Sequence, residues 1–309
     1  MYSRWFNFAV VALWLATMSW LVTEKILPPL FIGQPPSYQT IVQAQKENPV
    51  VGWKLMLNGR QLGWALSEAL TLENDLTEIH SQVHFDQLPL RELIPRWLRV
   101  LLPPISEHSL QSNLRMNTQS TLTIDPLGRL TSFRSTVKID PLDEAIKMQG
   151  TVEGTQLKVT VSSSEFSHST EAYLPEDALV ADAFSPLTQL PDLHEGQTWP
   201  VPVYSPLRPP GKPMEILVAT VERIEPLNWN GRAEDTWLVV YRRDSGFGLG
   251  SRKTPRGRLW VRRDGTVLKQ QVMLLDFTMT FVRMTDEEAA DRRLLPTTDV
   301  PSSTHRSTD

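Results

Sequence analysis

The sequence predicts a mainly β protein, with a large curved antiparallel sheet or half-barrel, one or two covering helices and one N-terminal transmembrane helix. Three observations lead to this fold class. Residues 49–284 read as strands separated by turn signals, and several of these runs alternate apolar and polar residues, as in antiparallel strands with one wet face. Two hairpin dipeptides, Asn58-Gly59 and Asp264-Gly265, each separate two strand-like runs. Residues 5–23 form one long run without a charge.

The composition restricts the possible functions. The chain has 309 residues, which is enough for a sizeable core in one or two domains. It contains no cysteine, so it has no disulfide, thiolate nucleophile or cysteine–zinc site. The formal net charge of −4 gives no general reason to bind nucleic acid, and we predict no nucleic-acid partner. The 24 prolines favour strands and loops over long helices.

Residues 5–23 (WFNFAVVALWLATMSWLVT) are predicted to form the transmembrane anchor. A helix of about 19 residues spans roughly 28 Å, close to the thickness of a bilayer core. Trp5 and Trp20 lie near its two ends, where membrane interfaces favour aromatic rings. The alternative is a cleaved signal peptide, but the following sequence TMSWLVTEK lacks small residues of the A-x-A kind.

The flanking charges predict the orientation of this anchor. Arg4 precedes the apolar run, so the positive-inside rule makes residues 1–4 a cytoplasmic tip. The rest of the chain then lies outside the cytoplasm. This predicts a single-pass protein of the cytoplasmic membrane with its C-terminal domain in the periplasm.

The remaining segments follow in order. Residues 24–48 combine a Pro-rich linker (PPLFIGQPP) with a short helix that begins at Ser37. Residues 49–284 are predicted to form the antiparallel β domain, which has a helical interruption at 175–190. Residues 285–309 are polar and rich in Pro, Ser and Thr, which predicts a disordered tail.

A second, amphipathic helix is predicted at 89–102, within the sequence LPLRELIPRWLRVLLPPI. Its large apolar residues recur at the i, i+3, i+4 spacing, and its arginines lie on the opposite side. An open sheet with an apolar concave face needs a cover, so we expect this helix to cap that face. The alternative places the helix on a membrane surface.

The last strand-like run, VLKQQVMLLDFTMTFVR, is interpreted as one strand with its Met and Phe side chains on a single face. Such walls suit pliant apolar ligands, whereas the ordinary alternative is a packed core. Together with the helix at 89–102, this face supplies the predicted ligand-binding residues, which are Leu93, Trp97, Leu101, Met273, Phe277 and Met279.

Basic residues gather in the stretch 242–263, and the alternation there places Arg256, Arg258 and Arg262 on one face of a strand. These three arginines are the candidate anion-binding residues, for a phospholipid headgroup, a cell-wall polymer or an acidic partner. The alternative is a solvated strand face, partly neutralised by Glu222 or Glu225.

The sequence carries no local catalytic or metal-binding motif. His80 and His84 have the i, i+4 spacing of a metal pair on a helix, but they fall in a strand-like alternation. Four residues along a strand cover roughly 13 Å, which is too far for one ion. The motifs HExxH and GxSxG are both absent. We therefore predict no enzyme activity, no cofactor and no metal site.

Four segments resemble a bacterial envelope family catalogued as domain of unknown function 3108: VGWKLMLNGRQLGWA, IDPLGRLTSF, LVADAFSPLTQLPDLHEGQTWPVPVYSP and RGRLWVRRDGTVLKQQVML. The resemblance covers about residues 50–284 and rests mostly on turns and strand starts. It implies an antiparallel β fold, similar in style to the lipoprotein carriers LolA and LolB, and no catalytic residues. The chain departs from the family in its inserted helix at 89–102 and its membrane anchor.

These observations predict a membrane-anchored, extracytoplasmic β domain that acts as a non-catalytic binding or carrier-like module for an apolar or amphiphilic envelope component. The alternative is a structural or assembly partner of another cell-envelope protein, without a small ligand. An enzyme built from residues distant in the sequence is the third hypothesis. The candidate partners are the membrane, a lipid or lipoprotein, and another envelope protein.

Overall fold

The structure is a computed structural model. It describes residues 4–23, 36, 40–41, 44, 50–72, 75–88, 114–140, 142–164, 167–174, 181–182, 186–204, 214–243, 255–274 and 277–294.

One large sheet dominates the fold, and the described strands number 15. Their order is β8-β7-β6-β5-β4-β3-β2-β1-β15-β14-β13-β12-β11-β10-β9, and neighbours are antiparallel except for β9 and β10. This confirms the predicted mainly β class and the large open antiparallel sheet. The strands are β1 (Val50–Leu57), β2 (Arg60–Thr71), β3 (Thr77–Leu88), β4 (Leu114–Ile124), β5 (Leu130–Asp140), β6 (Leu142–Glu153), β7 (Gln156–Ser162), β8 (Ser167–Tyr173), β9 (Ala181–Asp182), β10 (Thr198–Tyr204), β11 (Met214–Trp229), β12 (Arg232–Arg243), β13 (Gly257–Arg262), β14 (Val267–Leu274) and β15 (Phe277–Arg283).

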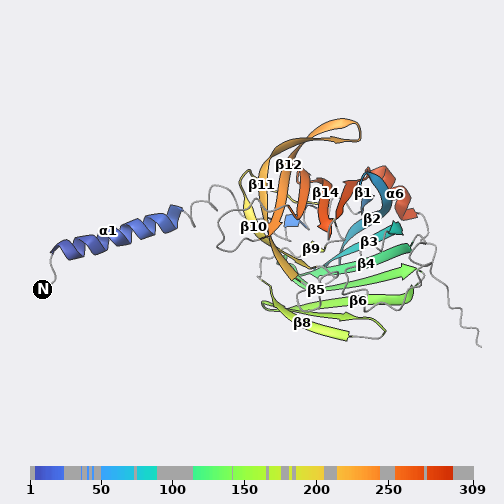
Figure 1. The fold of residues 1–309 in the computed structure, drawn as a ribbon, viewed down its shortest axis with the longest axis horizontal. Helices are drawn as coiled ribbons and strands as arrows, with labels where there is room; N and C mark the ends of the chain where they lie inside the picture. Colours follow the sequence, from blue (N-terminus) through green and yellow to red (C-terminus); the bar gives the residue numbers. More distant parts are fainter. Residues whose placement is uncertain are drawn as a thin grey trace, which may run out of the picture.

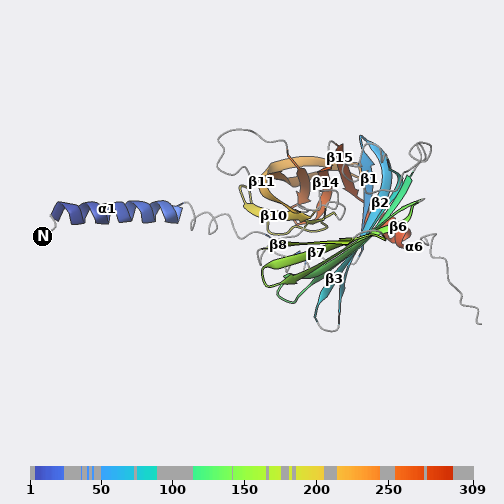
Figure 2. The same cartoon turned by 60° about the horizontal axis from the view of Figure 1, so that its bottom comes forward.

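The sheet consists of two lobes, β1–β8 and β9–β15, which meet where the first strand pairs with the last. At this junction Trp53 lies opposite Arg283 and Leu57 lies opposite Met279. The sheet curls so that the two lobes face each other (Figures 1 and 2). Within each lobe, almost every strand pairs with its neighbours in sequence, because short turns return the chain beside itself.

The hairpin predicted at Asn58-Gly59 is confirmed. Both residues have positive φ, 50° and 81°, and Leu57 pairs directly with Arg60. Asparagine and glycine tolerate this left-handed backbone, which matches the twist of a two-residue hairpin. The same geometry recurs at Asn230-Gly231, between β11 and β12.

The interpretation of residues 267–283 as one strand is wrong, because the run is a hairpin formed by β14 and β15. Met273 pairs with Thr278, and Val272 pairs with Met279. Met273 therefore lies on the face opposite to Met279. The apolar residues continue through the turn, so the alternation gave no sign that the chain had reversed.

The prediction of disorder throughout 285–309 is wrong for Asp286–Leu294, which forms helix α6. Thr285 and Glu288 form a capping box: the N–H of Glu288 donates to Thr285 Oγ1 (3.2 Å), and the N–H of Thr285 donates to Glu288 Oε2 (3.1 Å). The first turn is acidic and the last turn is basic, as the helix dipole favours. Residues 295–309 lie outside the described residues.

Helix α6 packs beside β1, on the face that points away from the opposing lobe (Figure 1). Gly52 permits this approach, since a Cβ at that position would lie 3.0 Å from the Cβ of Ala289. Lys54 Nζ also forms an ion pair of 2.6 Å with Glu288 Oε1. The helix is therefore attached to β1 by both close packing and charge.

Acid is expected to release α6 from the sheet. The hydrogen bond from Lys54 holds the pKa of Glu288 below its usual value of 4.5. A carboxylate with a depressed folded-state pKa stabilises the fold above its unfolded pKa, and this contribution disappears as pH falls through the folded pKa. Hydrogen exchange of the α6 amides should therefore accelerate selectively below about pH 4. Glu288→Gln should remove this pH dependence, and an unchanged acid response in that variant would contradict the assignment.

Of the two helices predicted within the β domain, the structure describes part of one and none of the other. The helix predicted at 175–190 is wrong where the structure describes it: Ala181 and Asp182 form β9, and Gln189 forms an isolated β-bridge with Thr266. The N–H of Leu190 donates to the carbonyl oxygen of Gly265 (2.7 Å), so this segment is attached to the β13–β14 turn. The helix predicted at 89–102 lies outside the described residues.

The N-terminal part contains helix α1 (Arg4–Leu21), and residues 5–23 are all exposed. None of the described helices combines the length and apolarity that crossing a bilayer requires.

In the predicted linker, Thr40, Ile41 and Ala44 are helical, and the side chain of Ile41 is 2% exposed within the core. The short helix predicted in the linker thus contributes to the interior of the sheet.

Candidate functional site in the interior of the sheet

The inner face of the sheet, shared by the two lobes, carries one continuous apolar cluster. Trp53 and Leu55 of β1 belong to it, together with Val159 of β7, Trp199 of β10 and Phe281 of β15. Alternation along each strand sends these side chains inward, while their neighbours point to the outer face. The interior therefore combines apolar surface from strands at both ends of the sheet.

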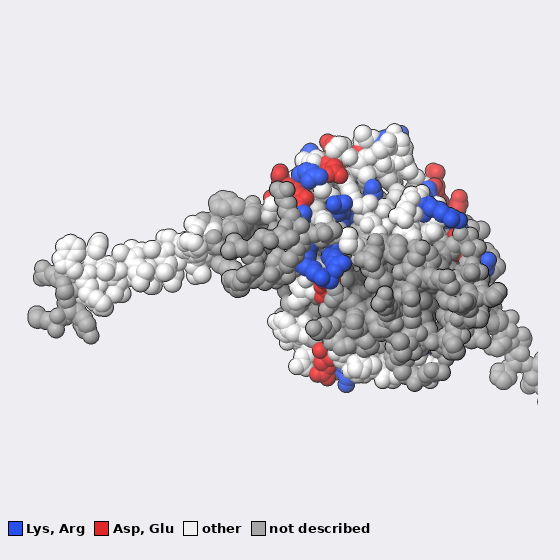
Figure 3. Space-filling view, in the orientation of Figure 1, with Lys and Arg blue, Asp and Glu red and all other residues white. Residues whose placement is uncertain are grey.

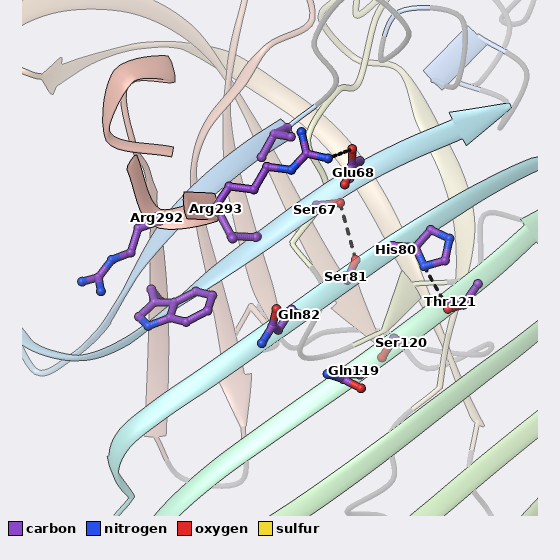
Figure 4. A pocket seen from close by; sticks show the side chains of 13 residues that line it. Ser67, Glu68, His80, Ser81, Gln82, Gln119, Ser120, Thr121, Arg292 and Arg293 are labelled. Carbon is purple, nitrogen blue, oxygen red and sulfur yellow. Dashed lines mark hydrogen bonds and ion pairs between the residues drawn. The ribbon is translucent and has the colours of Figure 1, made fainter. Parts of the chain in front are cut away.

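A row of serines crosses this apolar face. The register aligns Ser67 of β2 with Ser81 of β3, Ser81 with Ser120 of β4, and Ser120 with Ser135 of β5. Each of the four is at most 6% exposed. The Oγ atoms of Ser120 and Ser135 are 2.9 Å apart. Those of Ser67 and Ser81 are 3.5 Å apart (Figure 4). We call this row the serine ladder.

Other polar atoms on the inner face are buried without a partner. No described residue offers a hydrogen bond to Trp53 Nε1, Trp199 Nε1 or Thr118 Oγ1. These side chains are 0%, 4% and 1% exposed, respectively. An unpaired buried donor or acceptor costs about 1–3 kcal/mol, so such atoms are uncommon in a core that serves only to pack. With the serine ladder, they give the apolar interior a set of groups that can hydrogen-bond a guest molecule.

The structure brings only part of the predicted ligand wall to this interior. Met279 is 3% exposed in the core cluster, beside the fully buried Phe281. Phe277 is two residues before Met279 on the same strand, but the structure does not describe its side chain. Met273 is on the outer face. The predicted residues Leu93, Trp97 and Leu101 lie outside the described residues.

The predicted anion-binding arginines lie on and next to β13. Arg258 and Arg262 are on the outer face, and Arg256 immediately precedes the strand. Arg262 Nε lies 3.5 Å from Glu234 Oε2, and its guanidinium lies 5.5 Å from the centre of the Trp229 ring. The structure therefore groups Arg262 with an acidic and an aromatic side chain.

Other basic residues on this part of the outer face also lie close to acidic side chains. Arg242 forms an ion pair of 2.5 Å with Glu222, as the solvated-face alternative expected. A hydrogen bond from Trp260, together with Arg223, holds the pKa of Glu225 below its usual value. Acidic and basic side chains also lie side by side over β10–β12 (Figure 3). This mixture of charges differs from a purely basic surface, which would attract any polyanion.

The two strand histidines make local contacts. His80 Nε2 hydrogen-bonds Glu78 Oε2 at 2.9 Å, and His84 Nε2 lies 3.3 Å from Asp86 Oδ1. Among the residues that the structure describes, no group of three or more His, Asp or Glu side chains could hold a metal ion.

Sequence reasoning missed the serine ladder. Each of its members stands at an inward position of an alternating run, where an apolar residue is usual, so the signal was present strand by strand. The alignment of four serines in one row depends on the register between strands, which no single strand reveals.

Comparisons with known proteins give only distant similarity. No family model matches the chain, and no curated protein matches its sequence. A β-barrel-like protein of domain of unknown function DUF1849 from Brucella abortus is similar with a TM-score of 0.44 and 11% identity, over 76% of this chain and 95% of that one. A DUF1089 family protein from Pseudomonas aeruginosa has a TM-score of 0.32 and 14% identity, over 66% of this chain and 87% of that one. The hypothetical lipoprotein YmcC from Escherichia coli has a TM-score of 0.29 and 13% identity, over 79% of this chain and 87% of that one.

Proposed function

We propose that this chain is a membrane-tethered, non-catalytic binding module that holds an amphiphilic molecule of the bacterial envelope inside its curved sheet. The observation that carries the proposal is the serine ladder, which places four buried hydroxyl groups across an apolar inner face. A purely apolar guest would not need these hydroxyls, and a strongly polar guest would not need the apolar walls. An amphiphile has both kinds of group.

The chemistry of the interior assigns a place to each part of such a guest. Acyl chains would lie against apolar side chains such as Met279 and Phe281. An ester or amide carbonyl oxygen would accept hydrogen bonds from serine hydroxyls and from the indole N–H of Trp53 or Trp199. Contacts of this kind would satisfy donors that have no partner among the described residues.

Native mass spectrometry of the detergent-extracted protein tests the proposal. We expect the wild-type protein to retain a lipid-sized adduct and the double variant Ser120→Ala/Ser135→Ala to lose most of it. These two serines hydrogen-bond each other, so replacing both leaves no orphaned partner and should hardly change stability. Ser132→Ala, on the outer face of β5, is the matched control and should retain the adduct. Equal retention in the double variant and the control would contradict the proposal.

One observation favours the assembly alternative. The side chains of Trp53, Leu55 and Phe281 are fully buried within a single cluster, as in a core that is already filled. In that case the wild-type protein would carry no adduct in mass spectrometry, and the sheet would serve to dock another envelope protein.

The tether in the proposal rests on α1 and on the charges around it. Its large apolar side chains are exposed, with Trp5 at 81% and Trp20 at 69%, so they need an apolar environment outside the β domain. The family resemblance to domain of unknown function 3108 remains part of this proposal, as does the periplasmic location.

Cysteine labelling checks this topology, since the natural chain has no cysteine. Leu127 lies in the β4–β5 turn and is 66% exposed. We expect a membrane-impermeant maleimide to label Leu127→Cys in cells whose outer membrane is permeabilised, and to label Ser3→Cys only after lysis. A mature protein that begins near residue 20–25, or the reverse labelling pattern, would contradict the anchor.

A further inference from the structure

A groove of about 320 Å³, open to solvent, lies on the outer face of β2–β4 (Figure 4). The register places Leu66, Gln82 and Gln119 in one row across the three strands. The next row contains Glu68, His80 and Thr121. These side chains point away from the serine ladder, because they alternate with its members along each strand.

Helix α6 forms one side of this outer groove. Arg293 Nη2 forms an ion pair of 2.7 Å with Glu68 Oε1. The guanidinium of Arg292 lies 5.7 Å from the centre of the Trp64 ring, and that ring also stacks on His84 at 5.5 Å. Contacts from β2 thus fix both arginines, and the groove has a defined wall.

The charges in the groove largely cancel. Arg293 is neutralised by Glu68, and the carboxylate of Glu78 lies beside His80. A phosphate or polyanion site would concentrate cations without carboxylates between them. The remaining side chains on this face are Arg292, which lies against the Trp64 ring, two amides and a hydroxyl. The Nε2 atom of Gln82 is buried without a partner among the described residues. The guest that fits is therefore polar and uncharged or weakly charged.

The backbone of the groove is not available to a guest. Strand β3 is paired with β2 on one side and with β4 on the other, so its main-chain N–H and C=O groups are already bonded. An extended peptide that binds by adding a strand requires a free sheet edge. Recognition here has to use side chains alone.

We infer that the outer groove binds a saccharide. The amides of Gln82 and Gln119 each offer a donor and an acceptor, and Thr121 offers a hydroxyl, which together match the alternating donors and acceptors of neighbouring sugar hydroxyls. Leu66 and Trp64 supply apolar surface for the C–H groups of the ring. This inference is independent of the interior ligand, since the two sites lie on opposite faces of the sheet.

Isothermal titration of the full chain with neutral and uronic-acid oligosaccharides tests the inference, in a detergent without a sugar headgroup. We expect saturable binding to one of these classes and at least a tenfold loss of affinity in Gln82→Ala/Gln119→Ala. Gln149→Ala is the matched control, because Gln149 is exposed on the same face of β6, outside the groove. The control should bind as the wild type does.

Three results would overturn the inference. They are the absence of binding to any oligosaccharide, binding that the double variant retains at wild-type affinity, and binding of inorganic phosphate or an extended peptide in place of the sugars. The interior adduct seen by mass spectrometry should be unchanged in Gln82→Ala/Gln119→Ala. Failure at the groove is thus distinguishable from failure of the proposed interior site.

Discussion

Trp53→Ala is expected to lower the free energy of unfolding by about 3–5 kcal/mol. Trp53 is fully buried and belongs to β1, which joins the two lobes. It lies between Ala65 of β2 and Arg283 of β15, so its removal leaves a cavity at the junction itself. Typical domains are stable by about 5–15 kcal/mol, so the loss would be a large part of the total.

Urea unfolding followed by far-UV circular dichroism measures this effect. Trp14→Ala is the control, because Trp14 lies in α1 and is 56% exposed. We expect its midpoint to match that of the wild type. A change below about 1 kcal/mol in Trp53→Ala would mean that the neighbouring side chains close the cavity at little cost.

Gly63→Ala is expected to cost at least about 3 kcal/mol, the upper end of the usual range for overpacking. A Cβ on Gly63 would collide with the carbonyl group of His84 on β3. Gly63 pairs with Leu55 on one side and with Phe85 on the other, so neither neighbouring strand can retreat without breaking its own ladder. Since the obstacle is backbone, no change of rotamer relieves it.

The same unfolding experiment checks Gly63→Ala against Gly196→Ala. A Cβ on Gly196 would meet no heavy atom within 4 Å, although its φ is 81°. We expect that control to lose about 1–2 kcal/mol from backbone strain alone. Equal losses in both variants would show that β2 and β3 can separate locally to admit the methyl group.

Local chemistry explains which parts of the fold could be predicted. The Asn58-Gly59 hairpin was predictable because the two residues determine the turn by themselves. Helix α6 was also within reach, since Thr285 and Glu288 have capping-box spacing, but the polar composition of the following tail concealed it. The β14–β15 turn could not be predicted, because apolar residues continue through it and give no turn signal.

The candidate sites were less predictable than the fold because they depend on contacts between distant segments. The serine ladder needs the register of β2 through β5, and the outer groove needs α6 to lie against β2. Sequence alternation assigns each side chain to a face but does not align one strand with the next. Met279 was placed correctly in the interior, whereas Met273 was not, because one undetected reversal exchanges the faces.

The pairing of β1 with β15 has a consequence for how the chain folds. All other neighbouring strands can pair soon after they are synthesised, but β1 has to wait for the end of the β domain to arrive. Closing so long a loop is slow. Until it closes, the free edge of β1 stays open to pairing with another chain. Truncation before β15 would leave this edge permanently open, so it should produce aggregates rather than a stable half-protein.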